Sequence, residues 1–328
     1  MGILSLNTFL RENCRNIDNI VHFSQLKYKK ICVDVYNYIY RFLAKDKLIE
    51  DLEKLCKIFQ KYKINALFVF DGKYGEEKNT TQKNRRIKRK EAEEVYQQLI
   101  VKNILNKKEK HKLSKVKRER VKVTKWDIHD AKKCLDYCGM KFIVAPGEAE
   151  EYCSMLVNKK KVFACMSDDT DLFALDCKNI IRSVNLHRET FILTNVRIIC
   201  QNCGIDPINF KNICYLSSND YNSEISRSKN FFYYKKLYDK FIYTIEQFSQ
   251  ENVEHLQLNF ITWLFNNSYI NTRNLEKFNL VKEIYTKPSK QIMKNTKYIV
   301  IRNGAFNKEK VDELAIARRR YLKELYNK

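Results

Sequence analysis

Four apolar runs that each end shortly before an acidic side chain constrain the fold of this chain more than any other feature. Short apolar runs bounded by turn residues are typical of buried strands. The carboxyl ends of parallel strands meet at one edge of a sheet, where open α/β folds bind their ligands. We therefore predict a mostly parallel α/β sheet with acids gathered at one edge. The runs are ICV before Asp34, ALFVF before Asp71, KFIVA before Glu148 and Glu150, and VFACM before Asp169 and Asp171.

The gathered acids predict a divalent-metal site. Carboxylates that lie close together repel one another unless protons or cations neutralise them, and the hard ions Mg²⁺ and Mn²⁺ prefer oxygen ligands. The alternative is structural, because acids are common in the first turn of a helix and the segment SDDTD is an ordinary loop composition. Either acidic pair alone would favour that alternative. The same pattern at several strand ends favours the metal.

Several blocks of the chain resemble, in order and spacing, the signature blocks of the flap endonuclease/XPG family of structure-specific nucleases. The resemblance covers residues 1 to 221. It implies a central, mostly parallel sheet flanked by helices, which is a PIN-like nuclease core, with a helical arch insertion and a helical C-terminal region. It also implies endonuclease and 5′-3′ exonuclease cleavage of DNA flaps, nicks, gaps or branched junctions in replication, repair or recombination. The blocks are MGILSL, ICVDVYNYIYRFL, FVFDGKYGEEK, VKVTKWDIHDAKKCLDYCG, APGEAEEYCSML, MSDDTDLFAL and YLSSNDY.

The resemblance implies roles for single residues. Gly2 would approach the scissile phosphate once the initiator Met has been removed, and Tyr40 would stack on a base unstacked at the cleavage site. Acidic side chains would hold two Mg²⁺ or Mn²⁺ ions. These ligands are Asp34, Asp71, Glu148 and Glu150 for one ion, and Asp169, Asp171 and Asp220 for the other.

A long charged insertion runs from Gly72 to Trp126 and is dominated by Lys, Arg, Glu and Gln. Its pattern predicts weakly amphipathic helices, and a solvated charged helix or a disordered basic arm remains an alternative. The resemblance implies an arch through which a 5′ flap passes. Cations there would stabilise charge that accumulates in the transition state. The gateway residues are Lys78 and Arg85 as catalytic groups, Lys88 and Arg89 as DNA-binding groups, and Asn84 where the family has a further basic residue.

The chain departs from the family after Asp220. Family members continue with a glycine-rich hairpin that grips duplex phosphates through a monovalent cation, whereas this chain has EISRSKNFFYY and no Gly between Gly204 and Gly304. Only Gly has free access to the strained dihedral angles that such a hairpin uses. The monovalent-cation site is therefore doubtful in this chain. We hypothesise that Arg227 and Lys229 contact duplex phosphates directly instead.

Two domains are expected. Residues 1–221 would form the nuclease core with the arch insertion at 72–126, and residues 222–328 a helical extension that packs on the core and contacts duplex DNA. From residue 231 onward no family motif is recognisable, and neither is a sliding-clamp motif. The expected elements are helices at Asn195–Cys203 and Pro207–Leu216, a basic loop at Arg182–Arg188, a short strand at Tyr298–Ile301, and a basic amphipathic helix in VDELAIARRRYLKELYNK.

Charge and hydropathy indicate the kind of partner. The net charge of +23 predicts a polyanionic partner, because Lys and Arg that neutralise phosphates gain affinity by counterion release. Nucleic acid is the first candidate. An anionic membrane surface is the second, but the sequence has no apolar span long enough to cross a bilayer and no signal peptide. We expect an intracellular protein of the nucleus or cytoplasm. The prominence of Lys, Asn, Ile and Tyr suggests an A·T-rich genome, and a viral protein would act at a cytoplasmic replication site.

The eleven cysteines lie mostly among apolar residues, which is typical of reduced, buried thiols. A disulfide framework is not expected. One Cys-x-x-Cys pair, Cys200 and Cys203, has no second pair to complete a zinc site, so packing within a helix is the favoured interpretation.

Two rival functions fit the same fold. The altered hairpin makes a catalytically weak DNA-binding scaffold conceivable, although unused clustered carboxylates would repel DNA. An RNA-directed or purely exonucleolytic enzyme would use the same acids. Cleavage of matched DNA flaps, RNA flaps and blunt 5′ ends separates these alternatives.

Overall fold

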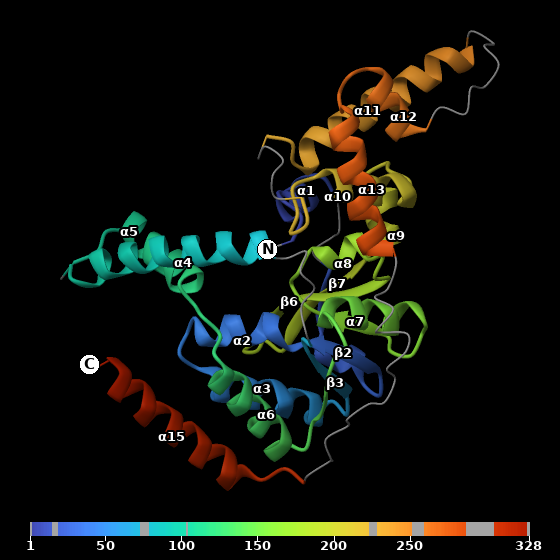
Figure 1. The fold of residues 1–328 in the computed structure, drawn as a ribbon. Helices are drawn as coiled ribbons and strands as arrows, with labels where there is room; N and C mark the ends of the chain where they lie inside the picture. The colour runs from blue at the N-terminus through green and yellow to red at the C-terminus, as the bar shows by residue number, and fades with distance from the viewer. Residues whose placement is uncertain are drawn as a thin grey trace.

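A computed structural model describes the protein over residues 2–14, 19–72, 79–102, 104–222, 228–250, 259–286 and 305–326 (Figure 1). Lys78, Arg227 and the strand expected at Tyr298–Ile301 lie outside these residues. No helix within the described ranges is long and apolar enough to span a membrane.

A seven-stranded sheet forms the centre of the molecule, in the order β1-β7-β6-β5-β2-β3-β4. The strands from β2 to β6 pair in parallel, whereas β7 runs antiparallel to both β6 and β1. This confirms the predicted mostly parallel α/β sheet. The strands are β1 (Ile20–His22), β2 (Lys30–Asp34), β3 (Asn65–Phe70), β4 (Lys141–Val144), β5 (Ala164–Met166), β6 (Asn179–Asn185) and β7 (Thr190–Asn195).

Helices cover both faces of the sheet, because successive side chains of a strand point to opposite faces. Cys32 of β2 belongs to one buried cluster, whereas its neighbours Ile31 and Val33 belong to the other. The first cluster includes α1 (Leu6–Asn13), α7 (Ala149–Asn158), α8 (Asp171–Ala174), α9 (Val196–Asn202), α10 (Pro207–Leu216), α11 (Phe231–Gln250), α12 (Phe260–Asn266) and α13 (Thr272–Thr286). The second includes the short 3-10 helix η1 (Phe23–Leu26), α2 (Val35–Leu43), α3 (Leu48–Lys61), α6 (Lys125–Tyr137) and α15 (Lys308–Tyr326).

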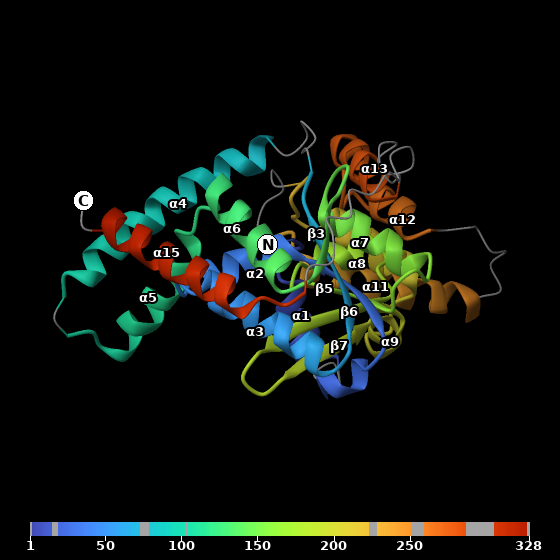
Figure 2. The ribbon, with the colours of Figure 1, turned by 90° about the horizontal axis from the view of Figure 1, so that it is seen from below.

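The charged insertion forms two helices, α4 (Asn79–Ile100) and α5 (Lys107–Glu119), which project from the body of the molecule (Figures 1 and 2). Their shared core is small, with Ala92, Leu99 and Val116 buried between them. A capping box at Asn106 and Glu109 begins α5. The helical prediction for this insertion is confirmed, and the scarcity of apolar residues explains why the pair stands apart.

The C-terminal region is helical and reaches two separate places. Helices α11 to α13 lie beside α1 and α10, whereas α15 lies on the other side of the molecule against α3 and α6 (Figure 1). On α15, the buried Arg318 donates to Asp127 and, over 2.7 Å, to Asp130 of α6. The expected helix in VDELAIARRRYLKELYNK is thus present.

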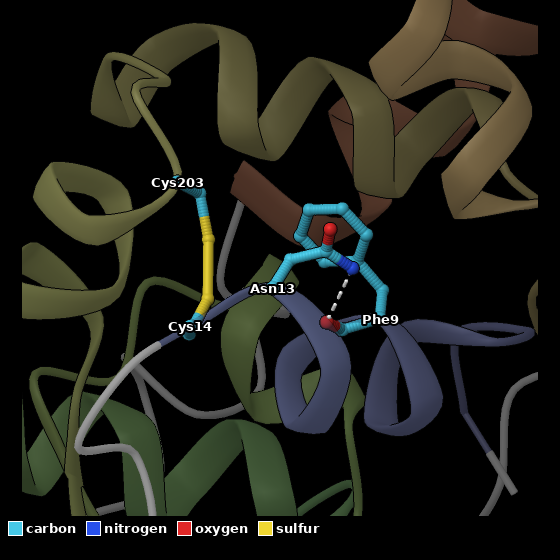
Figure 3. Close-up of a disulfide and its surroundings, with 4 residues drawn as sticks. All are labelled: Phe9, Asn13, Cys14 and Cys203. Atoms are coloured by element: carbon cyan, nitrogen blue, oxygen red, sulfur yellow. Dashed lines mark hydrogen bonds between the residues drawn. A yellow bond between two sulfur atoms is a disulfide. The ribbon is translucent and has the colours of Figure 1, made fainter.

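Two expectations about local structure are wrong. The segment Arg182–Arg188 was expected to be a basic loop, but β6 extends through Asn185 and the turn to β7 follows it. The cysteines as a set were expected to be reduced, yet Cys14 and Cys203 form a disulfide between the ends of α1 and α9 (Figure 3). These cysteines are separated by 189 positions, so sequence spacing gave no sign of the contact. The remaining cysteines are free and buried.

Candidate active site

The acids that follow the apolar runs arrive at one edge because their strands are neighbours. Strands β5, β2, β3 and β4 are consecutive in the sheet and parallel. Asp34 is the last residue of β2, and Asp71 directly follows β3. Glu148, after β4, is the N-cap residue of α7. Asp169 follows β5. The chain therefore delivers one acid from each of these strands to the carboxyl edge.

Three carboxylates converge most closely. Oxygens of Glu150, Asp169 and Asp171 all lie within 4.8 Å of one another. Asp171 is buried, and the other two are partly buried. Charges held this close repel one another, and a divalent cation relieves that repulsion. An all-oxygen donor set suits Mg²⁺ or Mn²⁺. The residues present therefore fit the metal that the sequence predicts.

Asp34 and Asp71 form the adjoining part of the site. Burial and the nearby charge of Asp71 raise the pKa of Asp34 well above its usual range, although Ser167 donates a 2.8 Å hydrogen bond to its Oδ2. Asp71 accepts a 2.7 Å hydrogen bond from the backbone N–H of Ala149, the first residue of α7. The start of this helix thus provides partial positive charge to the carboxylate. Bound cations would favour the ionised form of Asp34 and so counteract the rise in its pKa.

Two tyrosines from the C-terminal part of the chain border the same acids. The hydroxyl of Tyr221 lies 3.2 Å from Glu148 Oε2 and donates to it. Burial, followed by the charges of Asp171, Tyr221, Glu150 and Asp220, raises the pKa of Tyr285. Asp220, in the loop after α10, directly precedes Tyr221, whose hydroxyl contacts Glu148.

Gly2 lies against the acidic loop. Its φ is +85°, and an added Cβ would come within 2.5 Å of Asp169 Oδ1 and 2.3 Å of Thr170 Oγ1. The next backbone N–H, that of Ile3, donates to Thr170 Oγ1 over 2.7 Å. The amino end of the chain is thus held beside the carboxylate of Asp169 and the backbone of Asp171.

The tyrosines of α2 occupy different environments. Tyr38 is buried in the core, and Tyr40 is partly buried. Tyr36 packs edge-on against Phe70, and burial and the charges of Asp71 and Tyr40 raise the pKa of Tyr36 to about 12. Tyr36 therefore lies near Asp71.

The structure describes some of the predicted basic residues but not others. Lys88 is exposed and Arg89 is partly buried on α4. Arg85 also belongs to α4, but its side chain lies outside the described part of the chain. Lys78 and Arg227 lie wholly outside it. Lys229 is partly buried just before α11.

A basic cavity beside the acids was missed by sequence reasoning. It has a volume of about 1260 Å³ and lies between α1, α2, α5 and the β6–β7 pair. Asp168, next to the acidic cluster, accepts a 2.6 Å hydrogen bond from Ser183 N–H and lies 3.7 Å from Arg41. The lysines and arginines that line the cavity come from segments far apart in the sequence, so no local pattern revealed it: Arg11, Arg41, Lys45, Lys110, Lys117, Arg118 and Arg182.

Comparison with known proteins shows which protein family the chain resembles. The XPG N-terminal domain model matches residues 1–92, and the XPG I-region model matches residues 139–220. The probable RAD2-like endonuclease 369L of Invertebrate iridescent virus 6 is 24% identical over 284 residues, which span 69% of this chain and 68% of that protein. Flap endonuclease 1 of Eremothecium gossypii is 24% identical over 250 residues, 63% of this chain and 64% of that protein.

Solved structures share the fold. The catalytic core of Rad2 in complex with a DNA substrate has a TM-score of 0.61 at 18% identity, covering 97% of this chain and 95% of that one. Human GEN1 in complex with Holliday junction DNA has a TM-score of 0.58 at 14% identity, and the match covers 97% of this chain and 74% of that one. The sheet of this chain is therefore that of the PIN-like nucleases. The chain belongs to the XPG/flap endonuclease family of structure-specific, divalent-metal-dependent nucleases.

Proposed function

We propose that this chain is a Mg²⁺- or Mn²⁺-dependent endonuclease and 5′-3′ exonuclease that cleaves DNA at 5′ flaps, nicks, gaps or branched junctions. The observation that carries the proposal is the convergence of Glu150, Asp169 and Asp171 within 4.8 Å at the carboxyl edge of the sheet. Phosphodiester hydrolysis requires neutralisation of the charge on the attacking and leaving oxygens, which lie on opposite sides of the phosphorus. A cluster of oxygen donors in a family of nucleases supports that chemistry at this edge.

Two groups of carboxylates would hold two cations. When bound, such cations activate a water and stabilise the leaving 3′ oxygen. Ser167 holds Asp34 by a 2.8 Å hydrogen bond, and the Ala149 N–H holds Asp71, so both carboxylates are oriented before any substrate arrives. Glu150, proposed for the first ion, lies within 4.8 Å of Asp169 and Asp171, which are proposed for the second. The proposed ligands are Asp34, Asp71, Glu148 and Glu150 for one ion, and Asp169, Asp171 and Asp220 for the other.

Basic and aromatic side chains would position the DNA. Lys78 and Arg85 would stabilise transition-state charge, and Lys88 and Arg89 would bind the strand at α4. Tyr40 would stack on the unpaired base, and Gly2 would lie next to the scissile phosphate. The basic cavity between α5 and the sheet would contact further phosphates. Because phosphate contacts carry no base information, specificity would come from the shape of the DNA.

The domain organisation is part of the proposal. Residues 1–221 would form the nuclease core and residues 222–328 the extension that binds duplex DNA. Arg227 and Lys229 would contact the duplex in place of the family's monovalent-cation site. If replacing both by Ala leaves duplex affinity and its salt dependence unchanged, that assignment is wrong.

Cleavage of an end-labelled double-flap DNA tests the function. The native chain should cut at the base of the flap in Mg²⁺ and should not cut in EDTA. Asp169→Ala should abolish cutting, and Asp239→Ala, which removes an exposed acid of α11, should not. Tight binding without cleavage by the native chain would support the scaffold alternative. Efficient cutting of RNA flaps, or of blunt ends alone, would change the proposed substrate.

A further inference from the structure

Tyr285, near the end of α13, is buried next to the acidic site. Its side chain stacks on Tyr215 of α10 with a ring separation of 5.5 Å and an interplanar angle of 17°. It also meets Tyr221 edge-on at 5.3 Å. Only 8% of Tyr285 is exposed. These contacts hold the ring beside Tyr221, whose hydroxyl donates to Glu148.

The hydroxyl of Tyr285 has no hydrogen-bond partner among the residues that the structure describes. Burying a hydroxyl without a partner is unfavourable, because the group gives up its hydrogen bonds to water. Such a group in a folded protein calls for an explanation, and an ion that completes its surroundings is one of the usual ones.

The charges around Tyr285 indicate what it faces. Burial is the largest cause of its raised pKa, and the next are the charges of Asp171, Tyr221, Glu150 and Asp220. Three of these are proposed metal ligands, and two of them belong to the converging cluster. A protonated phenol is a hydrogen-bond donor, and ionised carboxylates are acceptors.

We propose that Tyr285 is a positioning residue for the metal site. Its O–H donates to the carboxylate ligands when a cation is bound, and so orients them. This inference rests on the proposed function, since it assumes that the acids bind divalent cations. It gives α13, which carries no recognisable sequence motif, a place in the active site. Outer-shell hydrogen bonds of this kind orient ligands and raise metal affinity.

A role in packing alone makes a different prediction. Tyr285→Phe keeps the ring that contacts Tyr215 and Tyr221 and removes only the hydroxyl. Tyr234→Phe is the matched control, because Tyr234 is also a buried tyrosine of the C-terminal helices, and the carboxylates of the site are not among the causes of its raised pKa. If the hydroxyl acts on the metal ligands, only the first change should weaken cation binding.

The experiment is a calorimetric titration of the full chain with Mn²⁺ alone, together with thermal unfolding in EDTA. We expect Tyr285→Phe to lower Mn²⁺ affinity about tenfold or more. In EDTA this variant should unfold at the unfolding temperature of the native chain or above it. Tyr234→Phe should keep the native Mn²⁺ affinity. Native Mn²⁺ affinity in Tyr285→Phe, equal losses in both variants, or a lower unfolding temperature without a change in affinity would overturn the proposal. A native chain that binds no Mn²⁺ would overturn the proposed function first and this inference with it.

Discussion

Three carboxylates at the sheet edge are each held by a neighbour from a different segment of the chain. Ser167 holds Asp34, the Ala149 N–H holds Asp71, and Tyr221 holds Glu148. A charged group that is oriented before substrate binds needs no reorganisation during the reaction. The acids are therefore oriented by residues that the sequence pattern of the acids alone does not reveal.

Gly2 gives the clearest prediction at the scale of a single residue. Its positive φ and the 2.5 Å approach to Asp169 exclude a Cβ. We expect Gly2→Ala to displace the acidic loop and lower kcat by up to about 100-fold, because small misplacements in a reacting site have effects of that size. Single-turnover cleavage of the double flap measures this change.

The matched control for Gly2 is Gly204→Ala. Gly204 also has a positive φ, of +60°, but an added Cβ there meets nothing within 4 Å. This variant should lose some stability from backbone strain and should keep its cleavage rate. Equal losses of rate in both variants would show that strain in general, and not the contact with Asp169, is responsible.

At the scale of elements, the arch is held together separately from the body. Its small core consists of Ala92, Leu99 and Val116, with Arg120 paired to Glu93 at 2.7 Å and placed over the ring of Tyr96. A pair of helices with so few apolar contacts should open locally well below the free energy of global unfolding.

Leu99→Ala tests this independence. We expect faster amide hydrogen exchange over residues 79–119, a nearly unchanged unfolding midpoint for the body, and slower flap cleavage. Leu135→Ala, within the second core cluster, should instead lower the free energy of global unfolding by about 2–5 kcal/mol. A global loss of the same size from Leu99→Ala would mean that the arch and the body unfold together.

The basic cavity makes a prediction about salt. Arg11 of α1 and Lys117 of α5 both line it, whereas Lys108 lies on α5 without lining it. If the first two contact phosphates, replacing each by Ala should weaken DNA binding regardless of sequence and reduce the slope of log K against log salt by about 1. Lys108→Ala should leave the slope closer to the native value. Equal slopes in all variants would exclude the cavity from the DNA surface.

At the scale of the whole molecule, the last helix returns to the first half of the chain. Arg318 of α15 is buried with Asp127 and Asp130 of α6. Removing one member of a buried ion pair leaves the other charge uncompensated, so we expect Arg318→Ala to lower the free energy of unfolding by about 3 kcal/mol. Chemical denaturation measures this, and Arg320→Ala, at an exposed position on the same helix, should change it little. A small effect of Arg318→Ala would mean that α15 adds little to the stability of the body.

The sequence predicted the sheet and its acidic edge because both depend on local patterns. Asp34 and Asp71 directly follow apolar runs, and parallel strands bring such residues together whatever the connecting segments are. Contacts between distant segments were not predictable. The Cys14–Cys203 disulfide, the contact between Tyr221 and Tyr285 and the Arg318–Asp127 pair depend on how whole elements pack, and no spacing along the chain encodes them.

The central claim is that this acidic edge binds the divalent cations that cut DNA. Anomalous scattering from Mn²⁺ in crystals of the native chain tests it most directly. We predict a peak between the carboxylates of Glu150, Asp169 and Asp171, and the loss of that peak in Asp169→Ala. Well-ordered carboxylates with no Mn²⁺ between them, at concentrations of the ion that support cleavage, would contradict the claim.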